Sequence, residues 1–403
     1  MKQQPANEHL LEGTTQQHMT NRISNQETDI IQSTRIGIIG GGQLGLMTAE
    51  AARTMGYASV TVLDATPQCP ASAVAQQIVG SLKDPAALRQ LARHADILTY
   101  EIEHINIEAL RALQAEGVKI LPAPDLLAII QNKYQQKEFL ARHGIPVAPY
   151  LSLASPADIE VAVKAWGYPL VLKAKKDAYD GRGNARINSP QDIDAALAKL
   201  GDRELYVEKC LDLDKELGLM IARNEQGEIA THPVVEMIHV RDICETVLAP
   251  APAPLSVQAE AQEIARQTIA YFNGVGIFGV ELFLDKAGKI WINEIAPRPH
   301  NLGHYTIEAC KTSQFTQHLR AITNLSLGAT DMLYPAAVME NILGTRNGPA
   351  EPKWTKDYTH VFVHIYGKRE TRIDRKMGHI TVVGEDLTNV YQQAKEARAA
   401  LSI

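Results

Sequence analysis

The sequence predicts an α/β protein in which a Rossmann-like parallel sheet comes first, mixed α/β domains follow, and a small β-rich domain ends the chain. Three observations predict this order. A strand, glycine-turn and helix pattern begins at residue 34, strand and helix patterns alternate up to residue 125, and short strand patterns prevail after residue 333. Strands that alternate with helices in this way form parallel sheets covered by helices on both faces.

Composition and charge exclude several classes of protein. The 403 residues suffice for two to three domains, and 40 Lys and Arg against 46 Asp and Glu give a net charge of −6. We therefore expect no nucleic-acid and no membrane partner, and a local cationic cluster wherever an anionic substrate binds. Four widely spaced cysteines, no apolar run long enough to span a membrane and no secretory leader predict a cytoplasmic protein.

The first strand pattern follows a polar segment. Residues 1–33 show no sustained periodicity and are predicted to be a disordered tail. Residues 35–39 form a buried-strand pattern, after which Gly40, Gly42 and Gly45 satisfy the GxGxxG spacing, and the next strand ends at Asp64. This pattern leaves three interpretations open: an NAD-dependent oxidoreductase, another ligand, or tight packing.

Candidate ligand contacts follow from the order of the strands. Further strands are expected at residues 95–100 and 118–121. Ligands of parallel sheets bind at the carboxyl ends of the strands, where Gln43, Leu44 and Glu101 fall. A solvated surface glutamate is the alternative for Glu101.

Two lysines and a glycine loop indicate phosphate binding in the second domain. Residues 126–144 are predicted to form one helix that carries Lys133, and an apolar strand near residues 169–175 contains Lys173. The loop at residues 177–184 has two glycines, which let a phosphate approach the backbone. The alternatives are a lysine that extends to solvent and an ordinary hairpin turn.

Paired carboxylates are predicted on two successive strands, at residues 275–284 and 289–294. Pairing these strands places Glu281 beside Glu294. Two such carboxylates repel each other unless a cation lies between them, and Mg²⁺ on a nucleotide is the usual one. The alternative is a hairpin with two solvated glutamates.

A proline-rich loop comes next. Pro297 and Pro299 prevent both a continued central ladder and the start of a helix, so Arg298, His300 and Asn301 are predicted to lie on a stiff loop. Cationic and amide donors beside a carboxylate suit oxyanion or phosphate chemistry.

The C-terminal part contains strand patterns at residues 337–342, 360–366 and 379–383. The turn at residues 367–376 is rich in Lys and Arg. Such a run is usually a solvated face, and in an acidic protein it is also the best candidate for an anion site.

Seven motifs together resemble one known family. They are, in chain order, IGIIGGGQLGLM, TYEIEHI, YDGRGN, FGVELF, INEIAPRPHNLGHYT, SQFTQHLRAITNL and YGKRETRIDRKMGHITV. Their order is similar to that in the N5-carboxyaminoimidazole ribonucleotide synthetases, ATP-grasp enzymes of purine biosynthesis, and it extends from about Thr34 nearly to the end of the chain. The resemblance implies a pre-ATP-grasp domain at 34–125, an ATP-grasp domain at 126–330 divided near residue 203, and a C-terminal domain at 331–403.

The resemblance also implies a reaction and its partners. ATP and bicarbonate form carboxyphosphate, which carboxylates 5-aminoimidazole ribonucleotide and yields ADP, phosphate and the N5-carboxy product. The implied cation is Mg²⁺ or Mn²⁺, and the implied assembly is a homodimer.

Residue roles follow from the matching motifs. The implied ATP contacts are Lys133, Lys173, Tyr179, Gly181, Arg182, Gly183, Glu208, Lys209, Cys210, Leu211, Glu216, His239, Asn293 and Glu294. The implied metal ligands are Glu281, Asn293 and Glu294. The implied catalytic residues are Asp180, Arg298, His300 and Asn301. The implied ribotide contacts are Gln43, Leu44, Glu101, Tyr179, Asp180, Arg182, Lys368, Arg375 and Lys376.

Three departures from the family pattern keep alternatives open. Asp177 and Ala178 stand where two glycines are common, and Lys133 stands where Arg is usual. The sequence Glu-Ile-Glu-His at residues 101–104 resembles the formate-dependent glycinamide ribonucleotide transformylase, which is the nearest alternative. A non-catalytic, nucleotide-binding regulatory protein is the alternative of another class.

Overall fold

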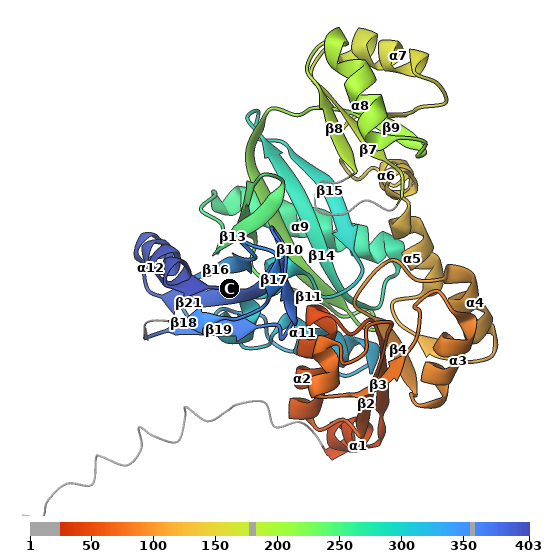
Figure 1. The fold of residues 1–403 in the computed structure, drawn as a ribbon, viewed down its shortest axis with the longest axis vertical. Coiled ribbons are helices and arrows are strands. Elements are labelled where there is room, and N and C mark those ends of the chain that lie inside the picture. The colour runs from red at the N-terminus through yellow and green to blue at the C-terminus, as the bar shows by residue number, and fades with distance from the viewer. Residues whose placement is uncertain (1–24, 177–182, 355–358) are drawn as a thin grey trace, which may run out of the picture.

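The computed structural model describes residues 25–176, 183–354 and 359–403. A small lobe stands at the top of Figure 1, the N-terminal domain lies at the bottom, and the C-terminal strands lie on the left. A long central sheet connects these regions, and the predicted mixed α/β architecture is confirmed.

The N-terminal domain is built on a five-stranded parallel sheet in the order β3-β2-β1-β4-β5. The strands are β1 (Arg35–Ile39), β2 (Ser59–Asp64), β3 (Gln76–Val79), β4 (Ile97–Tyr100) and β5 (Lys119–Ile120). The helices are α2 (Gln43–Met55), η1 (Pro70–Ala73), α3 (Pro85–Arg93) and α4 (Ile107–Ala115). The predicted parallel sheet is confirmed, and because β1 and β4 are neighbours, the segments that follow them meet at one edge.

A short helix precedes this sheet. The prediction of a disordered tail is wrong for α1 (Asn25–Ser33), because Ile31 is buried in the core of the N-terminal domain and the Glu27 carboxylate lies 3.0 Å from Arg320. One apolar anchor in a polar helix gives too little periodicity to be recognised from sequence. Residues 1–24 lie outside the described residues.

The helix predicted over residues 126–144 is two helices, α5 (Pro124–Gln131) and α6 (Lys133–Arg142). Asn132 has an extended backbone between them, and its side chain accepts the N–H groups of Tyr134 and Gln135 at 3.1 Å. An asparagine that caps the second helix ends the first one at the same place.

The small lobe contains an antiparallel sheet in the order β6-β9-β7-β8, with α7 (Ala157–Trp166), η2 (Pro190–Asp192) and α8 (Ile193–Leu200). The strands are β6 (Tyr150–Ser152), β7 (Leu170–Ala174), β8 (Asn184–Ile187) and β9 (Leu205–Lys209). Because β9 pairs with β6 and β7, the change of sheet falls after Lys209 and not near residue 203 as expected.

The central sheet runs β15-β14-β10-β12-β13-β16-β21-β19, with β11 added to β10, and its neighbouring strands are antiparallel. Its strands are β10 (Leu213–Arg223), β11 (Ile229–Thr231), β12 (Val235–Val240), β13 (Ile243–Ala249), β14 (Gly276–Asp285), β15 (Ile290–Ala296), β16 (Ala336–Leu343), β19 (Val361–Ile365) and β21 (Lys376–Gly384). The helices that accompany it are α9 (Leu255–Phe272), η3 (Asn301–Gly303), α10 (Thr306–Ala309), α11 (Gln314–Ile322) and α12 (Leu387–Ala399).

The C-terminal region is β-rich, as predicted, but it has no main sheet of its own. Strands β16, β21 and β19 continue the central sheet through the pairing of β13 with β16. The remaining short strands are β17 (Gly348–Pro349), β18 (Lys353–Trp354), β20 (Glu370–Thr371) and β22 (Leu401–Ser402), which form two separate pairs.

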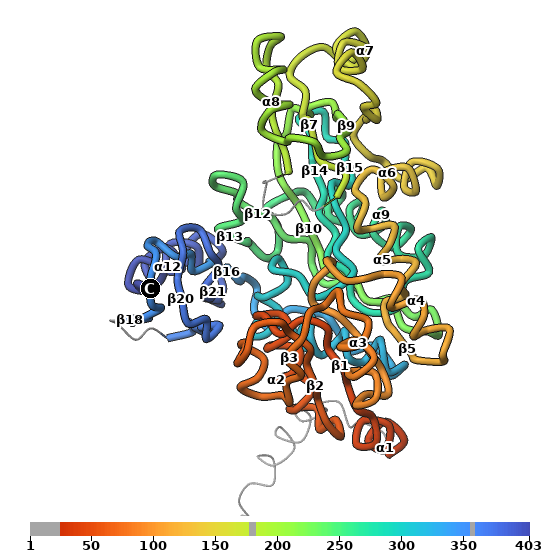
Figure 2. Tube along the Cα trace, turned by 45° about the vertical axis from the view of Figure 1, so that its right-hand side comes forward, coloured from red at the N-terminus to blue at the C-terminus, as the bar shows by residue number. Residues whose placement is uncertain are grey.

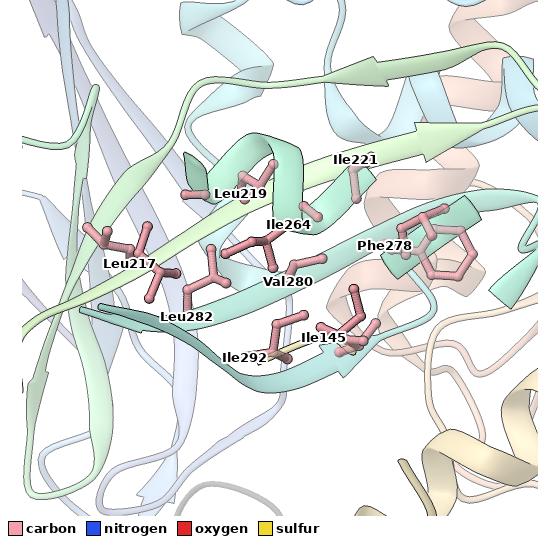
Figure 3. Close-up of a cluster of buried hydrophobic side chains, with 14 of the residues drawn as sticks. Ile145, Leu217, Leu219, Ile221, Ile264, Phe278, Val280, Leu282 and Ile292 are labelled. Atoms are coloured by element: carbon pink, nitrogen blue, oxygen red, sulfur yellow. The ribbon is translucent and has the colours of Figure 1, made fainter. Parts of the chain in front are cut away.

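One face of the central sheet packs on α9. Leu217, Leu219 and Ile221 of β10 and the alternate residues Phe278, Val280 and Leu282 of β14 surround Ile264 of α9 (Figure 3). Since alternate residues of a strand point to opposite faces, this apolar core fixes the register and directs the intervening glutamates to the other face.

Helix α11 joins the central sheet to the N-terminal domain. Leu319 and Ile322 are buried in the core of that domain, and His318 Nε2 lies 2.7 Å from Thr99 Oγ1. Figure 2 shows the N-terminal domain against the lower end of the central strands from a second direction. Among the described residues, none of the helices combines the length and the apolar character that crossing a membrane requires.

Candidate active site

The predicted carboxylates lie side by side on β14 and β15. The register pairs Glu281 with Glu294, and it then shifts so that Leu282 pairs with Ile292. The shift leaves Asn293 as the extra residue of a β-bulge, and Asn293 and Glu294 are both partly exposed in succession. Asn293 Nδ2 donates to Glu281 Oε2 at 3.2 Å, so the bulge brings a third polar side chain to the two carboxylates.

Burial and charge perturb the pKa values of this group. Burial, and then the neighbouring Glu294, raise the pKa of Glu281 to about 7. Burial also acts to raise the pKa of Glu294, but Lys133, whose Nζ lies 2.6 Å from Glu294 Oε2, outweighs it and lowers this pKa. Burial acts to lower the pKa of Lys133, and the charge of Glu294 raises it overall. Glu281 therefore lacks a strong cationic partner, whereas Glu294 has one.

This donor set fits Mg²⁺. Two carboxylates and an amide supply the oxygen ligands that this ion prefers, and a cation beside Glu281 would relieve the repulsion that raises its pKa. Within residues 25–176, 183–354 and 359–403, no three His, Cys, Asp or Glu side chains form a complete metal cage. Phosphate oxygens or water would therefore have to complete the coordination.

A histidine and a glutamate lie on the same face of the sheet. His239 Nδ1 of β12 lies 3.0 Å from Glu216 Oε2 of β10. Burial acts to lower the pKa of His239, but the hydrogen bond and charge of Glu216 outweigh it, and the pKa is raised. The raised pKa favours the protonated form of His239 near Glu281, and the contact of His239 with a nucleotide stays a prediction.

A buried ionic cluster lies where the small lobe meets α6. The carboxylate of Glu208 is 3.0 Å from the Nζ atoms of both Lys137 and Lys173. Burial acts to raise the pKa of Glu208, but the two lysines outweigh it and lower this pKa to about 2. Glu208 therefore fixes Lys173 at the end of β7, and its own carboxylate is occupied by the two lysines. The part played by Lys137 was not predicted.

The loop that follows β15 is held from several sides. Arg298 forms an ion pair with Glu103 of the N-terminal domain, with Nε 2.8 Å from Oε1. Asn301 and Asn341 of β16 exchange two side-chain hydrogen bonds of 2.9 and 2.7 Å. These tertiary contacts add to the restriction that the prolines impose, and the stiffness of the loop stays a prediction. The side-chain amide of Asn301 is hydrogen-bonded to Asn341, so a direct contact of Asn301 with a substrate stays a prediction.

The ring of His300 faces the carboxylates. A Cβ atom at Gly279 of β14 would lie 2.6 Å from His300 Cβ, so only glycine permits this approach. His300 Nε2 lies 3.7 Å from Glu281 Oε1, and Nδ1 accepts the N–H of Leu302 at 3.5 Å, which leaves the proton on Nε2. Burial and the charge of Arg298 hold the pKa of His300 well below its usual range, so the ring is a neutral donor.

The glycine turn of the N-terminal domain binds carboxylates. The N–H groups of Gly42 and Gly45 donate to Glu101, the second at 2.6 Å, and the N–H of Gly41 donates to Asp64 at 2.9 Å. In a dinucleotide-binding domain this helix N-terminus receives the pyrophosphate. Because Glu101 occupies it, the geometry speaks against an NAD-dependent oxidoreductase. The alternative of a solvated surface glutamate is also wrong for Glu101, whose burial raises its pKa.

The cationic turn of the C-terminal region reaches the site at one end. Lys368 Nζ donates to the carbonyl of Lys376 at 2.6 Å, and Arg375 Nη1 donates to the carbonyl of Glu370 at 2.7 Å. The ring of His379 on β21, the strand that Lys376 begins, lies 4.7 Å from the ring of His304 at the end of the proline-rich loop. The structure thus brings part of this turn to the candidate site.

Some predicted residues cannot be located. Tyr179, Asp180, Gly181 and Arg182 lie outside the described residues, as do Asp177 and Ala178. Gly183 accepts the N–H of Ala174 at one end of β7, Lys209 ends β9 beside the other end, and Cys210 and Leu211 connect β9 to β10. Gln43 and buried Leu44 begin α2, next to the glycine turn that holds Glu101.

A cavity of about 230 Å³ opens between the N-terminal domain and this site. It is lined by both ion pairs, Lys133 with Glu294 and Arg298 with Glu103, and by Lys83, His104, Ile105, Ile130, Gln131 and Lys176. An anion in this cavity would meet the cations of both pairs.

Three family models match consecutive parts of the chain. The ribonucleotide synthetase preATP-grasp domain matches residues 33–131, the ATP-grasp domain matches residues 138–315, and the phosphoribosylaminoimidazole carboxylase C-terminal domain matches residues 337–393. These models account for the N-terminal sheet, the central region and the C-terminal strands in turn.

A curated relative decides the family. The N5-carboxyaminoimidazole ribonucleotide synthase of Synechococcus elongatus is 38% identical over 367 residues, which cover 89% of this chain and 92% of the relative. The chain belongs to the N5-carboxyaminoimidazole ribonucleotide synthase family. As a member of this family it is an ATP-grasp ligase of purine biosynthesis, and the predicted resemblance is confirmed.

A further synthase and two longer relatives show similar matches. The structure of N5-carboxyaminoimidazole synthase from Aspergillus clavatus with ADP and 5-aminoimidazole ribonucleotide is 36% identical, has a TM-score of 0.83, and the match covers 91% of this chain and 98% of that one. The phosphoribosylaminoimidazole carboxylase of Ogataea methanolica is 44% identical over 371 residues. The match covers 89% of this chain, and this chain spans about two thirds of the length of that protein and of its Saccharomyces cerevisiae counterpart.

Proposed function

We propose that the protein uses ATP to carboxylate 5-aminoimidazole ribonucleotide with bicarbonate and forms the N5-carboxy product, ADP and phosphate. The observation that carries this proposal is the in-register pair of Glu281 and Glu294, which faces His300 on the adjoining loop. A relative of the same family was solved with ADP and 5-aminoimidazole ribonucleotide, which supports the choice of substrates.

The nucleotide is held between the small lobe and the central sheet. Lys133 and Lys173 contact its phosphates, and they are already held in place by the carboxylates of Glu294 and Glu208. The segment 208–211, Glu216 and His239 lie along the adenosine, and the loop at residues 179–183 covers the phosphates. Glu281, Glu294 and Asn293 would hold Mg²⁺, or Mn²⁺, and the bound ion would supply positive charge beside the phosphates.

The first step forms carboxyphosphate. A bicarbonate oxygen attacks the γ-phosphorus of ATP, and the bond from that phosphorus to the bridging oxygen of ADP breaks. Arg298 stabilises the anion by its positive charge, and neutral His300 donates a hydrogen bond to the anion from Nε2. Neither side chain transfers a proton in this step. Asn301 lies beside His300 and completes this group.

The second step transfers the carboxyl group. The C–O bond of carboxyphosphate breaks, inorganic phosphate keeps the electron pair, and CO₂ is released next to the ribotide. The amine nitrogen forms the new N–C bond and loses one proton, which we assign to Asp180. Water must be excluded throughout because carboxyphosphate hydrolyses readily.

The ribotide lies between the N-terminal domain and the C-terminal turn. Gln43, Leu44 and Glu101 form one wall of its pocket, and Tyr179 and Arg182 close it. Lys368, Arg375 and Lys376 bind its 5′-phosphate, because guanidinium and ammonium groups are the usual phosphate donors.

An ADP-release assay tests this function against its alternatives. We expect release that requires both 5-aminoimidazole ribonucleotide and bicarbonate, with one carboxylated ribotide formed for each ADP. Release that depends on glycinamide ribonucleotide and formate would instead identify the formate-dependent transformylase. Binding of Mg-ATP with no ribotide-stimulated release would indicate a non-catalytic regulatory protein.

Assembly and location are separate proposals. The family resemblance favours a homodimer, and light scattering on the purified protein at micromolar concentration tests it. The composition favours a cytoplasmic protein with neither nucleic-acid nor membrane partners. Cell fractionation tests the location.

A further inference from the structure

The side-chain amide of Gln314 forms two hydrogen bonds to the backbone of His300, a contact that we call an amide clamp. Gln314 Oε1 accepts the N–H of His300 at 2.8 Å, and Gln314 Nε2 donates to the carbonyl of the same residue at 2.9 Å. This double contact has the pattern of a residue pair in an antiparallel sheet, where one residue exchanges both bonds with its partner. The amide of Gln314 thus stands in for a neighbouring strand.

His300 needs such a substitute because of its position. Pro297 and Pro299 lack N–H groups, so a strand ladder cannot hold the chain on either side of Arg298. His300 comes directly after the second proline, and it is the residue whose ring faces Glu281. A hinge at this residue would move the ring away from the carboxylates.

The surroundings of Gln314 fix the amide itself. Its residue is fully buried, and Nε2 also lies 3.0 Å from Nδ1 of His304, so both of its N–H donors are used. Its backbone N–H donates to Thr306 Oγ1 at 2.9 Å, and Thr306 Oγ1 donates to the carbonyl of Gly303 at 2.6 Å. A Cβ at Gly303 would lie 2.7 Å from Gln314 Oε1, so a glycine at this position leaves the space that the amide occupies.

A second glutamine on the same helix makes the same kind of contact elsewhere. Gln317 Oε1 accepts the N–H of Gly328 at 2.8 Å, and Gln317 Nε2 donates to the carbonyl of Gly328 at 2.9 Å. Gln317 is buried to the same extent as Gln314. Gly328 belongs to the connection before β16 and contributes nothing to the candidate site. Helix α11 therefore carries two similar amide clamps, and only the clamp of Gln314 ends on a residue of the site.

We propose that Gln314 is a positioning residue for the carboxylation reaction, because it sets the place of His300 relative to the bicarbonate-derived anion. This inference rests on the proposed function. Gln314 contacts no reacting atom and acts only through the His300 backbone. Without Gln314, the proline-rich loop that carries His300 should shift. Carboxyphosphate should then form more slowly, and part of it should be hydrolysed by water before the carboxyl group is transferred.

The two clamps provide a matched experiment. Gln314→Leu and Gln317→Leu each remove a buried amide that holds one backbone N–H and one carbonyl, so we expect similar losses of thermal stability. The turnover number of Gln314→Leu should fall by about 100-fold with little change in the KM for ATP, whereas Gln317→Leu should keep the turnover number per folded molecule. The ADP released per ribotide carboxylated should rise several-fold in Gln314→Leu alone.

The ratio of ADP released to ribotide carboxylated distinguishes a positioning role of Gln314 from a purely stabilising one. Unfolded protein lowers the measured rate but does not change this ratio. If either leucine variant fails to fold, Gln314→Asn and Gln317→Asn replace them, since asparagine keeps the amide but is one methylene too short to reach both groups. Equal turnover and equal coupling in the two variants of a pair would overturn the proposal. A wild-type protein without bicarbonate-dependent ADP release would count against the proposed function instead.

Discussion

Two cationic regions meet the candidate site, and they are built in opposite ways. In the loop at residues 297–304, Arg298, His300 and Asn301 are each held by a group from another element, namely Glu103, Gln314 and Asn341. In the turn at residues 367–376, Lys368 and Arg375 donate to carbonyl groups of the same turn. The side chains of the loop are therefore fixed by other elements, whereas these two cationic side chains of the turn are held within the turn, whose backbone is bonded to Gly344 and Ala350.

This difference indicates different tasks. Hydrogen-bond donors that are already fixed in place need little rearrangement when negative charge develops on the reacting group, which suits stabilisation of a transition state. A turn with exposed cations, such as Arg372 with 69% of its side chain accessible, adapts to a phosphate that does not change during the reaction. Changes near the loop should therefore act on the turnover number, and changes in the turn should act on the KM for the ribotide.

The largest effect is expected for Glu294→Gln. This variant removes a carboxylate that faces Glu281 and pairs with Lys133, so it removes a proposed metal ligand and releases the partly buried Lys133. Turnover should fall by at least about 100-fold, since mutation of a residue that only hydrogen-bonds to a metal ligand already lowers metal affinity or activity by about 10 to 100-fold. ADP release, with circular dichroism as the check on folding, measures the effect, and Glu260→Gln on the exposed face of α9 is the control. Activity near that of the control would remove Glu294 from the metal site.

A smaller and different effect is expected for Lys368→Ala. It removes a proposed phosphate contact that would be present in both the ground and the transition state, so the KM for the ribotide should rise by about 10-fold while the turnover number changes little. Steady-state kinetics with varied ribotide measure this. Arg369→Ala alters the neighbouring residue of the same turn and should leave the KM unchanged. A rise confined to the KM for ATP would place the phosphate grip elsewhere.

The smallest effect concerns stability and pH. The pKa of Glu281 is about 7 in the folded protein against an ordinary value of 4.5, so the folded state holds this proton more tightly than the unfolded chain does. The resulting stabilisation is complete at pH values below the ordinary pKa and is lost as the pH rises through 7, with a total on the order of 3 kcal/mol. Thermal melts of the nucleotide-free protein should show this loss.

The Glu281→Gln variant sharpens the pH prediction. Glutamine cannot ionise, so its melting temperature should fall less than that of the wild type across neutral pH. Mg-ATP should also flatten the wild-type profile, because a cation beside Glu281 favours the ionised form. Parallel profiles of the variant and the wild type would contradict the assignment of the raised pKa to Glu281.

Much of the fold and part of the site could be predicted from short stretches of sequence. The parallel sheet followed from alternating strand and helix patterns, and the pairing of Glu281 with Glu294 followed from two adjacent strands with a short connection. The restriction of the chain after β15 followed from two prolines. In each case the information lies within a few dozen residues and depends on backbone geometry and apolar periodicity.

Other features could not be predicted in this way. The break at Asn132 was missed because a capping asparagine and a helix-interior asparagine look alike in a periodic pattern. The bulge at Asn293 was missed because alternation alone cannot show that one residue is left unpaired. The partners Glu103, Lys137, Gln314 and Asn341 were missed because nothing local distinguishes them from surface or core polar residues.

By itself the sequence determined most of the strands and helices, which acidic side chains share a sheet face, and where two prolines restrict the chain after β15. Only the tertiary structure decided that Glu101 fills the glycine turn, that the C-terminal strands extend the central sheet, and that Gln314 holds His300. The physical reason is the distance along the chain over which each kind of interaction acts. Backbone preferences and apolar periodicity act between near neighbours, whereas these contacts join separate elements and form only when the burial of apolar surface has fixed how the elements pack.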